Sequence, residues 1–238
     1  MAALAVESRP FGPRSERRDG SAALADGTLL IVSGMGPTAA GEAARALVAA
    51  GAEALISWGM AGALDPALVA GTLVLPGEVV SPEGALFLAA RDWRERLAAA
   101  LVAAHPVCSG RLLTCCEAIA STQDKALAFR QTAAAAVDME SSAVAEVAAG
   151  HRLPFLAVRA IVDTAGDAVP QAALTAAAGP GAVGLGRVLG SLARNPRDLP
   201  ALLRLAGRYR AASRALAAAA HCRALTPDVA GSAGNPLP

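Results

Sequence analysis

Apolar, strand-like segments alternate with helical segments along most of this 238-residue chain. Residues 54–57 and 155–162 are short runs of small and branched apolar side chains, whereas residues 37–50 and 91–104 follow the spacing of amphipathic helices. Such alternation is typical of parallel strands that are joined by helices. The sequence therefore predicts an α/β fold with a mostly parallel, central mixed sheet flanked by helices.

Composition narrows the class of protein. Hydrophobic residues make up 54% of the chain but aromatic residues only 3%, so alanine, leucine and valine must fill the core. The formal net charge of +1 gives no reason to expect a nucleic-acid partner. The spacing of the four cysteines fits neither a zinc site nor a disulfide framework, and the three histidines lie far apart. We therefore expect reduced thiols, no metal site and a cytoplasmic location.

The chain contains no internal repeat and no linker between domains. Residues 1–192 are predicted to form the main domain. Residues 193–225 are predicted to be a basic, amphipathic helical extension packed on it, and residues 226–238 a flexible tail.

Carboxylates follow three of the predicted strands: Glu7, Glu140 and Asp163. Open α/β sheets bind ligands at the carboxyl ends of their strands, so these acids are candidates for one reaction site. Asp163 follows the apolar run 155–162, where poor solvation would raise its pKa and suit it to act as a general acid. A capping role for Asp163, and a helix-dipole role for Glu140, remain the structural alternatives.

Glycine-rich turns are predicted to leave three strands, at residues 34–36, at residues 59–62 and at Gly166. The first turn lacks the third glycine and the later acid of a dinucleotide-binding fingerprint, and the chain has no phosphate-binding P-loop. No nucleophile elbow of the G-x-S-x-G type is present either. We therefore expect no cofactor.

Four sequence blocks resemble one known family. Val-Asp-Met-Glu-Ser-Ser-Ala-Val-Ala (137–145) and Arg-Ala-Ile-Val-Asp (159–163) resemble the signature pair of the purine nucleoside phosphorylase and methylthioadenosine/S-adenosylhomocysteine nucleosidase superfamily. Ser-Gly-Met-Gly (33–36) and Gly-Met-Ala-Gly-Ala-Leu (59–64) are similar to its other two blocks. The resemblance covers roughly residues 3 to 190.

This resemblance implies cleavage of an N-ribosidic bond. Met139 and Glu140 would hold the ribose, and Asp163 would protonate the leaving base. The resemblance also implies a small-molecule nucleoside substrate and a homo-oligomer. The other residues that it assigns to substrate binding are Gly36, Gly59, Met60 and Ile119, of which Ile119 stands where nucleosidases carry a stacking phenylalanine.

The resemblance leaves the acceptor open between water and phosphate. Glu7 matches the carboxylate that activates water in the nucleosidases. The phosphorylases carry an arginine and a serine at positions that here are Ser57 and Met60, which weakens the usual phosphate site. Phosphate remains the alternative co-substrate because arginines of the N-terminal loop could supply cations, namely Arg9, Arg14, Arg17 and Arg18.

The C-terminal segment is basic. From Leu199 through Arg223 the chain has no acidic residue but five arginines. A helix of this kind can make peripheral contact with an anionic membrane, here through residues 197–223, or can simply cover the sheet. This ending is similar to the hopanoid-associated phosphorylase branch, which implies a membrane-lipid nucleoside, adenosylhopane, as substrate and a place at the inner membrane surface.

Three other functions remain open on the sequence. The chain could be an ordinary methylthioadenosine/S-adenosylhomocysteine nucleosidase. It could bind nucleosides without cleaving them, because folds are reused for unrelated functions. It could also be a structural partner that only docks at membranes.

Overall fold

The computed structural model of the chain describes residues 7–12, 15–16, 21–24, 26–169 and 199–227. The apolar run at residues 2–6, which is typical of a strand, and residues 174–192, whose pattern is helical in part, lie outside these residues. The described helices are α1 (Pro37–Ala49), α2 (Arg91–Leu101), α3 (Thr122–Thr132), α4 (Ser141–Gly150) and α7 (Leu199–Ala220), with 3-10 turns η1 (Arg9–Phe11) and η3 (Arg223–Leu225).

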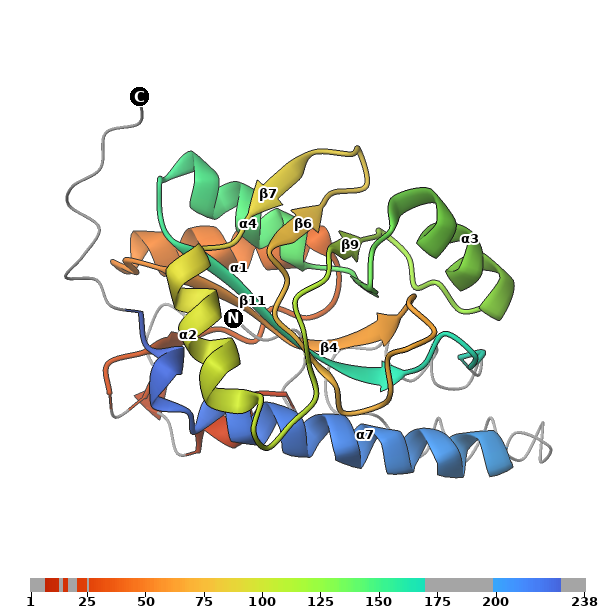
Figure 1. Cartoon of the computed structure of the whole chain (residues 1–238). Coiled ribbons are helices and arrows are strands. Elements are labelled where there is room, and N and C mark those ends of the chain that lie inside the picture. Colours follow the sequence, from red (N-terminus) through yellow and green to blue (C-terminus); the bar gives the residue numbers. More distant parts are fainter. Residues whose placement is uncertain (1–6, 13–14, 17–20, 25, 170–198, 228–238) are drawn as a thin grey trace.

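The described strands form one large sheet and one small one (Figure 1). The large sheet has the order β7-β6-β9-β10-β4-β11-β5-β8. Its strands are β4 (Leu55–Ala63), β5 (Leu73–Val74), β6 (Glu78–Val80), β7 (Leu86–Leu88), β8 (Val107–Cys108), β9 (Leu112–Thr114), β10 (Ala136–Asp138) and β11 (Phe155–Asp163). The small antiparallel sheet consists of β1 (Ser15–Glu16), β2 (Ala22–Ala23) and β3 (Leu29–Leu30). The Asp-Gly pair at residues 26–27, which is typical of hairpin turns, lies between β2 and β3.

The large sheet is mixed, as predicted. β6 with β9, β9 with β10, β4 with β11 and β5 with β8 are parallel pairs. β7 with β6, β10 with β4 and β5 with β11 are antiparallel pairs. The long pair β4–β11 lies at the centre and carries most of the residues discussed below.

Helices cover both faces of this sheet (Figure 1). On one face, α1 and α4 bury Leu47 and Val144 against side chains such as Ile161 of β11. On the other face, α2 and α7 bury residues such as Trp93 and Leu216 against the sheet. Alternate residues of β11 therefore enter different cores, which explains why its sequence is apolar almost throughout. The result is a three-layer α/β/α arrangement.

Local sequence signals explain where two of the helices begin. α1 starts at Pro37, directly after Gly36, whose φ of 97° is accessible mainly to glycine. α3 begins after Ser121, whose hydroxyl accepts a hydrogen bond from the Asp124 N–H at 3.0 Å. The pattern Ser-x-x-Asp at residues 121–124 is typical of a capping box and predicts this helix start, and the helix runs to Thr132.

The glycine-rich turn predicted at residues 59–62 is wrong. These residues continue strand β4, which runs to Ala63. Glycine usually weakens a strand, but it also allows close approach of other groups. A Cβ on Gly62 would lie 2.9 Å from an oxygen of Asp163, and one on Gly59 would overlap the Arg159 guanidinium. The glycines of β4 thus make room for buried charged side chains.

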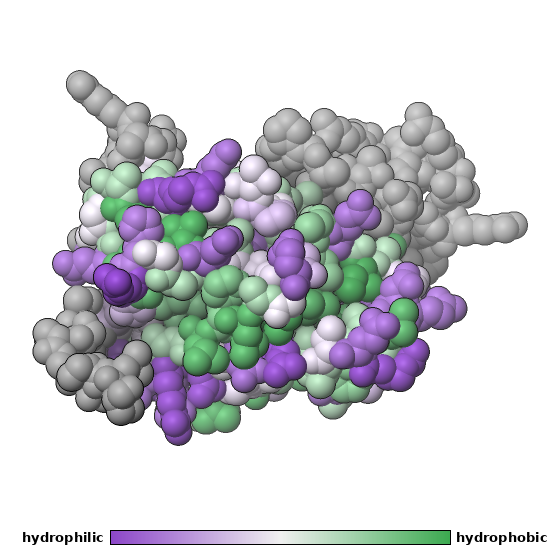
Figure 2. Space-filling model, turned by 90° about the horizontal axis from the view of Figure 1, so that it is seen from above, coloured by the Kyte–Doolittle hydropathy of each residue, from purple (hydrophilic) through white to green (hydrophobic). Residues whose placement is uncertain are grey.

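The molecular surface has an apolar centre on the face seen from above (Figure 2). Leu86 and Leu88 of strand β7 are 52% and 69% exposed. None of the described helices is long and apolar enough to cross a membrane. All four cysteines are free thiols.

Candidate active site

Glu7 is buried beside strand β4. Its Oε1 accepts a hydrogen bond from the Met60 N–H at 2.9 Å, and its carbonyl oxygen accepts one from the Trp58 indole at 3.0 Å. The missing side chain of Gly59 leaves the space in which the Glu7 carboxylate lies. The fold therefore holds Glu7 at both its main chain and its side chain.

Arg159 is the buried centre of the site. It lies in the middle of β11, opposite Gly59, and its side chain is fully inaccessible to solvent. Its Nη2 lies 2.7 Å from Asp138 Oδ2 and 3.5 Å from Glu140 Oε2, and it also donates to the hydroxyls of Ser57 and Ser141. Its Nη1 has no hydrogen-bond partner among the residues that the structure describes. Because a buried donor without a partner is costly, this nitrogen marks a place for a ligand atom or water.

Nη1 of Arg159 and the Glu7 carboxylate converge on Gly59. A Cβ built on Gly59 would overlap Arg159 Nη1 and would also lie 3.0 Å from Glu7 Oε1. The guanidinium and the carboxylate thus fill the volume that a side chain at position 59 would take.

Asp138 and Glu140 meet Arg159 from the start of helix α4. Asp138 accepts hydrogen bonds from the Thr114 hydroxyl at 2.8 Å and from the Ser141 N–H at 3.1 Å. It therefore fixes the start of the helix, and both of its carboxylate oxygens have partners. Glu140 Oε1 accepts the Gly36 N–H at 3.1 Å. Glu140 is thus held between the first turn of α1 and the guanidinium of β11.

Burial dominates the electrostatics of this cluster. It raises the pKa of Glu140 to about 7, with Arg159 acting against it and the charges of Asp138 and Glu7 adding to it. Burial alone would lower the pKa of Arg159, but the surrounding carboxylates outweigh it, so the guanidinium stays charged. Glu140 is therefore a carboxyl that can change its charge near neutral pH.

Asp163 lies at the far end of β11, where a register shift between Ile161 and Asp163 redirects the chain. Its carboxylate packs against Gly62 of β4, three residues beyond the glycine that faces Glu7. Burial raises the pKa of Asp163, and its ion pair with Lys125 of α3 opposes this. The two predicted catalytic acids therefore flank the same strand.

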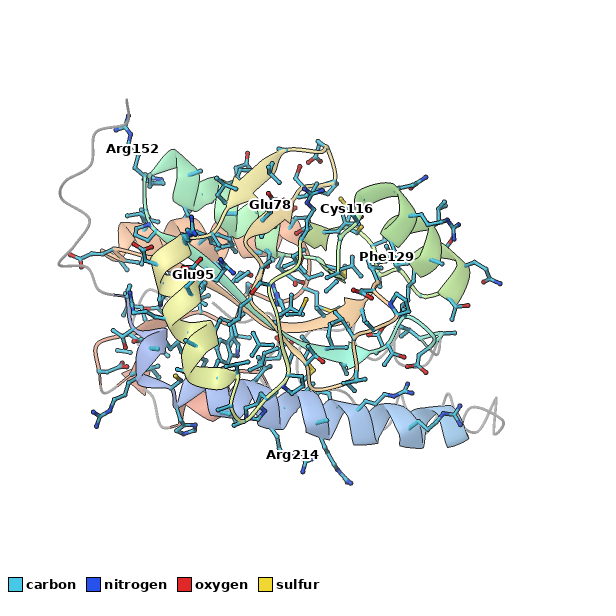
Figure 3. All side chains as sticks on the ribbon, in the orientation of Figure 1. Glu78, Glu95, Cys116, Phe129, Arg152 and Arg214 are labelled. Carbon is cyan, nitrogen blue, oxygen red and sulfur yellow. The ribbon has the colours of Figure 1, made fainter. Side chains whose placement is uncertain are left out.

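The remaining predicted substrate residues surround these acids. Met139 is half-buried in the turn between β10 and α4. Met60 gives its N–H to Glu7, while its side chain packs on the α7 side of the sheet. Ile119 packs near Leu113 and Val137 in a separate apolar cluster, together with Phe129, which lies on the sheet-facing side of α3 in Figure 3.

Sequence reasoning missed two charged residues of the site, Arg159 and Lys125. Arg159 had a detectable signal, because a charge within the apolar run 155–162 must be buried and paired. Lys125 had none, because its spacing on α3 is that of an ordinary surface lysine. Among the described residues, no group of three His, Cys, Asp or Glu side chains is placed to hold a metal ion.

This arrangement suits proton transfer beside a polyhydroxylated ligand. Glu140 can accept hydrogen bonds from hydroxyl groups, and the Glu7 carboxylate can accept a proton from an attacking water. Asp163, separated from them along β4, can donate a proton to a group at the other end of the ligand.

Comparisons with known proteins identify the family and the fold. The sequence model of the phosphorylase superfamily matches residues 7–180. The methylthioadenosine/S-adenosylhomocysteine nucleosidase of Neisseria meningitidis, solved with methylthio-immucillin-A, has a similar structure, with a TM-score of 0.69 and 18% identity over 92% of this chain and 95% of that one. Futalosine hydrolase of Helicobacter pylori is similar with a TM-score of 0.62 and 20% identity over 80% and 96%. No curated protein matches the chain.

Proposed function

This chain belongs to the phosphorylase superfamily, a family of enzymes that break N-glycosidic bonds, and we propose that it removes adenine from a nucleoside. One observation carries the proposal: the buried Glu7–Arg159–Glu140 cluster and Asp163 lie along one strand, β4. An enzyme that cleaves a nucleoside needs one group to bind the ribose, one to protonate the leaving base and one to activate the acceptor. We assign all three roles to these residues.

The proposed reaction divides its work among these side chains. Glu140 accepts hydrogen bonds from the ribose hydroxyls, and Met139 packs on the sugar. Asp163 gives a proton to a ring nitrogen of the base while the C–N bond breaks and its electron pair leaves with the base. The carboxylates stabilise the positive charge that the sugar gains in the transition state. Glu7 takes the proton from the attacking water.

Water is the acceptor that the charges favour. Asp138, Glu140 and Glu7 all surround the single guanidinium of Arg159, so the cluster is rich in negative charge. A phosphate dianion would need free cations, and here the Ser57 hydroxyl is already bonded to Arg159 and Ser141. We therefore propose hydrolysis, with phosphorolysis as the alternative.

For the group at the 5′ position we propose a hopanoid, which makes adenosylhopane the substrate. Arg204, Arg210 and Arg214 are exposed on α7, and in Figure 3 Arg214 points away from the body of the molecule. A basic helix surface of this kind supports peripheral contact with the anionic inner membrane surface, where such a lipid would lie. The exposed Leu86 and Leu88 support a homo-oligomer.

The test is adenine release from adenosylhopane, with and without phosphate, beside methylthioadenosine. We expect release from adenosylhopane without phosphate, and a loss of about 10²-fold or more in D163N. A phosphate requirement would make the enzyme a phosphorylase, and turnover of methylthioadenosine alone would exclude the lipid substrate. Binding of nucleoside without cleavage by the wild type, or full turnover by D163N, would contradict the proposed reaction.

A further inference from the structure

Lys125 is a fully buried lysine that the proposed reaction does not use. It projects from the first turn of α3, and its side chain has no exposure to solvent. A buried ammonium group is retained only where its charge and its three protons find partners. The partners of Lys125 therefore indicate its purpose.

All three partners of Lys125 belong to the segment that carries the proposed acid. Its Nζ forms an ion pair with Asp163 Oδ2 and donates to the carbonyl oxygens of Thr164 at 3.0 Å and Asp167 at 2.8 Å. The two carbonyl bonds alone would fasten the loop to α3. The third bond reaches the carboxylate of Asp163 itself, which a purely structural fastening does not require.

The other charged groups near Asp163, Asp167 and Arg208, form no ion pair with it. Arg208 of α7 pairs with the Asp167 carboxylate, which also accepts hydrogen bonds from the Thr164 N–H and hydroxyl. On strand β4, Asp163 pairs with Gly62, which carries no charge. Among the described residues, three charged groups thus shift the pKa of Asp163. Lys125 is in direct contact with it, whereas Asp167 and Arg208 act without direct contact.

We propose that Lys125 is a positioning residue that holds Asp163 by one carboxylate oxygen and stabilises the negative charge which forms when Asp163 gives its proton to the leaving base. This inference rests on the proposed function. A buried carboxylic acid without a nearby cation keeps its proton too firmly to be an effective donor. The ammonium group makes Asp163 a stronger acid, and among the described residues none donates a hydrogen bond to Oδ1, which can therefore face the base. The proton that leaves with the base is restored to Asp163 from solvent after the base departs.

The test compares the pH dependence of kcat in the wild type, K125Q and R208Q. Glutamine keeps an amide donor for the loop carbonyls but removes the charge. Because Asp163 must be protonated to act, and because losing the cation raises its pKa, the alkaline limb of kcat in K125Q should move up by about one pH unit or more. The plateau rate should fall by about tenfold or more. R208Q, which loosens the same loop through Asp167, should move this limb much less than K125Q does, because Arg208 lowers the pKa of Asp163 only weakly and makes no ion pair with it.

A uniform loss of rate in K125Q with an unmoved alkaline limb would overturn the proposal, since a merely structural lysine would behave in that way. An equal shift in R208Q would overturn it as well, because the effect would then belong to the loop.

A second measurement needs no activity. In D163N the buried ammonium of Lys125 loses its counter-charge, so K125Q should lower the midpoint of urea unfolding less in the D163N background than in the wild type. An equal loss in both backgrounds would refute the pairing. A wild type that cleaves no nucleoside would instead refute the proposed function, while this comparison would still judge the pair.

Discussion

Glu140 links the charge of the site to the stability of the protein. Burial raises its pKa from 4.5 to about 7, so the folded state binds a proton more tightly than the unfolded state. Its contribution to stability is complete below about pH 4.5 and is lost as the pH rises towards 7. E140Q resembles the protonated form. Between pH 5 and 8 the wild type should therefore lose about 2 kcal/mol more free energy of unfolding than E140Q, as measured by urea titration. Parallel pH profiles would mean that Glu140 is ionised throughout.

Single residues differ in how far the sequence reveals their role. Glu7, Glu140 and Asp163 could be identified because each follows an apolar strand, and such positions share one edge of a sheet. Arg159 could have been found, since a buried charge demands partners. Lys125 could not, because its partners lie 38 to 42 residues away in the chain and meet it only after folding.

The elements of the fold were more predictable than their ends and their order. Apolar runs and helix caps located β11, α1 and α3 correctly, because these signals act between neighbouring residues. The extent of β4 was missed because glycines at 59 and 62 argue locally against a strand. These two glycines are needed because of contacts between distant parts of the chain, since each lies against a charged side chain of β11. The order of the strands likewise depends on pairings between distant segments, such as the antiparallel contact of β10 with β4.

The need for glycine at position 62 of β4 can be tested directly. In G62A the new methyl group would lie 2.9 Å from Asp163 Oδ2, so the acid must move. We expect adenine release to fall roughly tenfold or more, and the free energy of unfolding to fall by about 1–3 kcal/mol. G207A is the control, because nothing lies within 4 Å of a Cβ at that position of α7. It should leave activity unchanged and raise stability by up to about 1 kcal/mol. Unaltered activity in G62A would separate Asp163 from the chemistry.

The whole molecule places the site and helix α7 in one framework. α7 buries Ala212, Ala215, Leu216 and Ala219 against the sheet, at the spacing of one helix face. Arg208 connects the same helix to the loop that follows Asp163. The sequence predicted a basic, amphipathic helix here but left two uses open. The structure gives α7 a covering role on its apolar face, and its exposed arginines remain available for a partner.

The proposed membrane contact can therefore be tested without disturbing the core. The variant R204Q/R210Q/R214Q changes only exposed side chains of α7. Each arginine near an anionic bilayer contributes about 1 kcal/mol, so binding to vesicles that contain phosphatidylglycerol should weaken roughly 10²-fold in a sedimentation assay. Turnover of a soluble, short-chain adenine nucleoside should stay the same, because these side chains are exposed to solvent and belong to none of the proposed site residues. Vesicles of phosphatidylcholine alone provide the control, since they carry no net charge to attract the wild type. Equal binding of both proteins to anionic vesicles would remove the membrane role and leave α7 as a cover for the sheet.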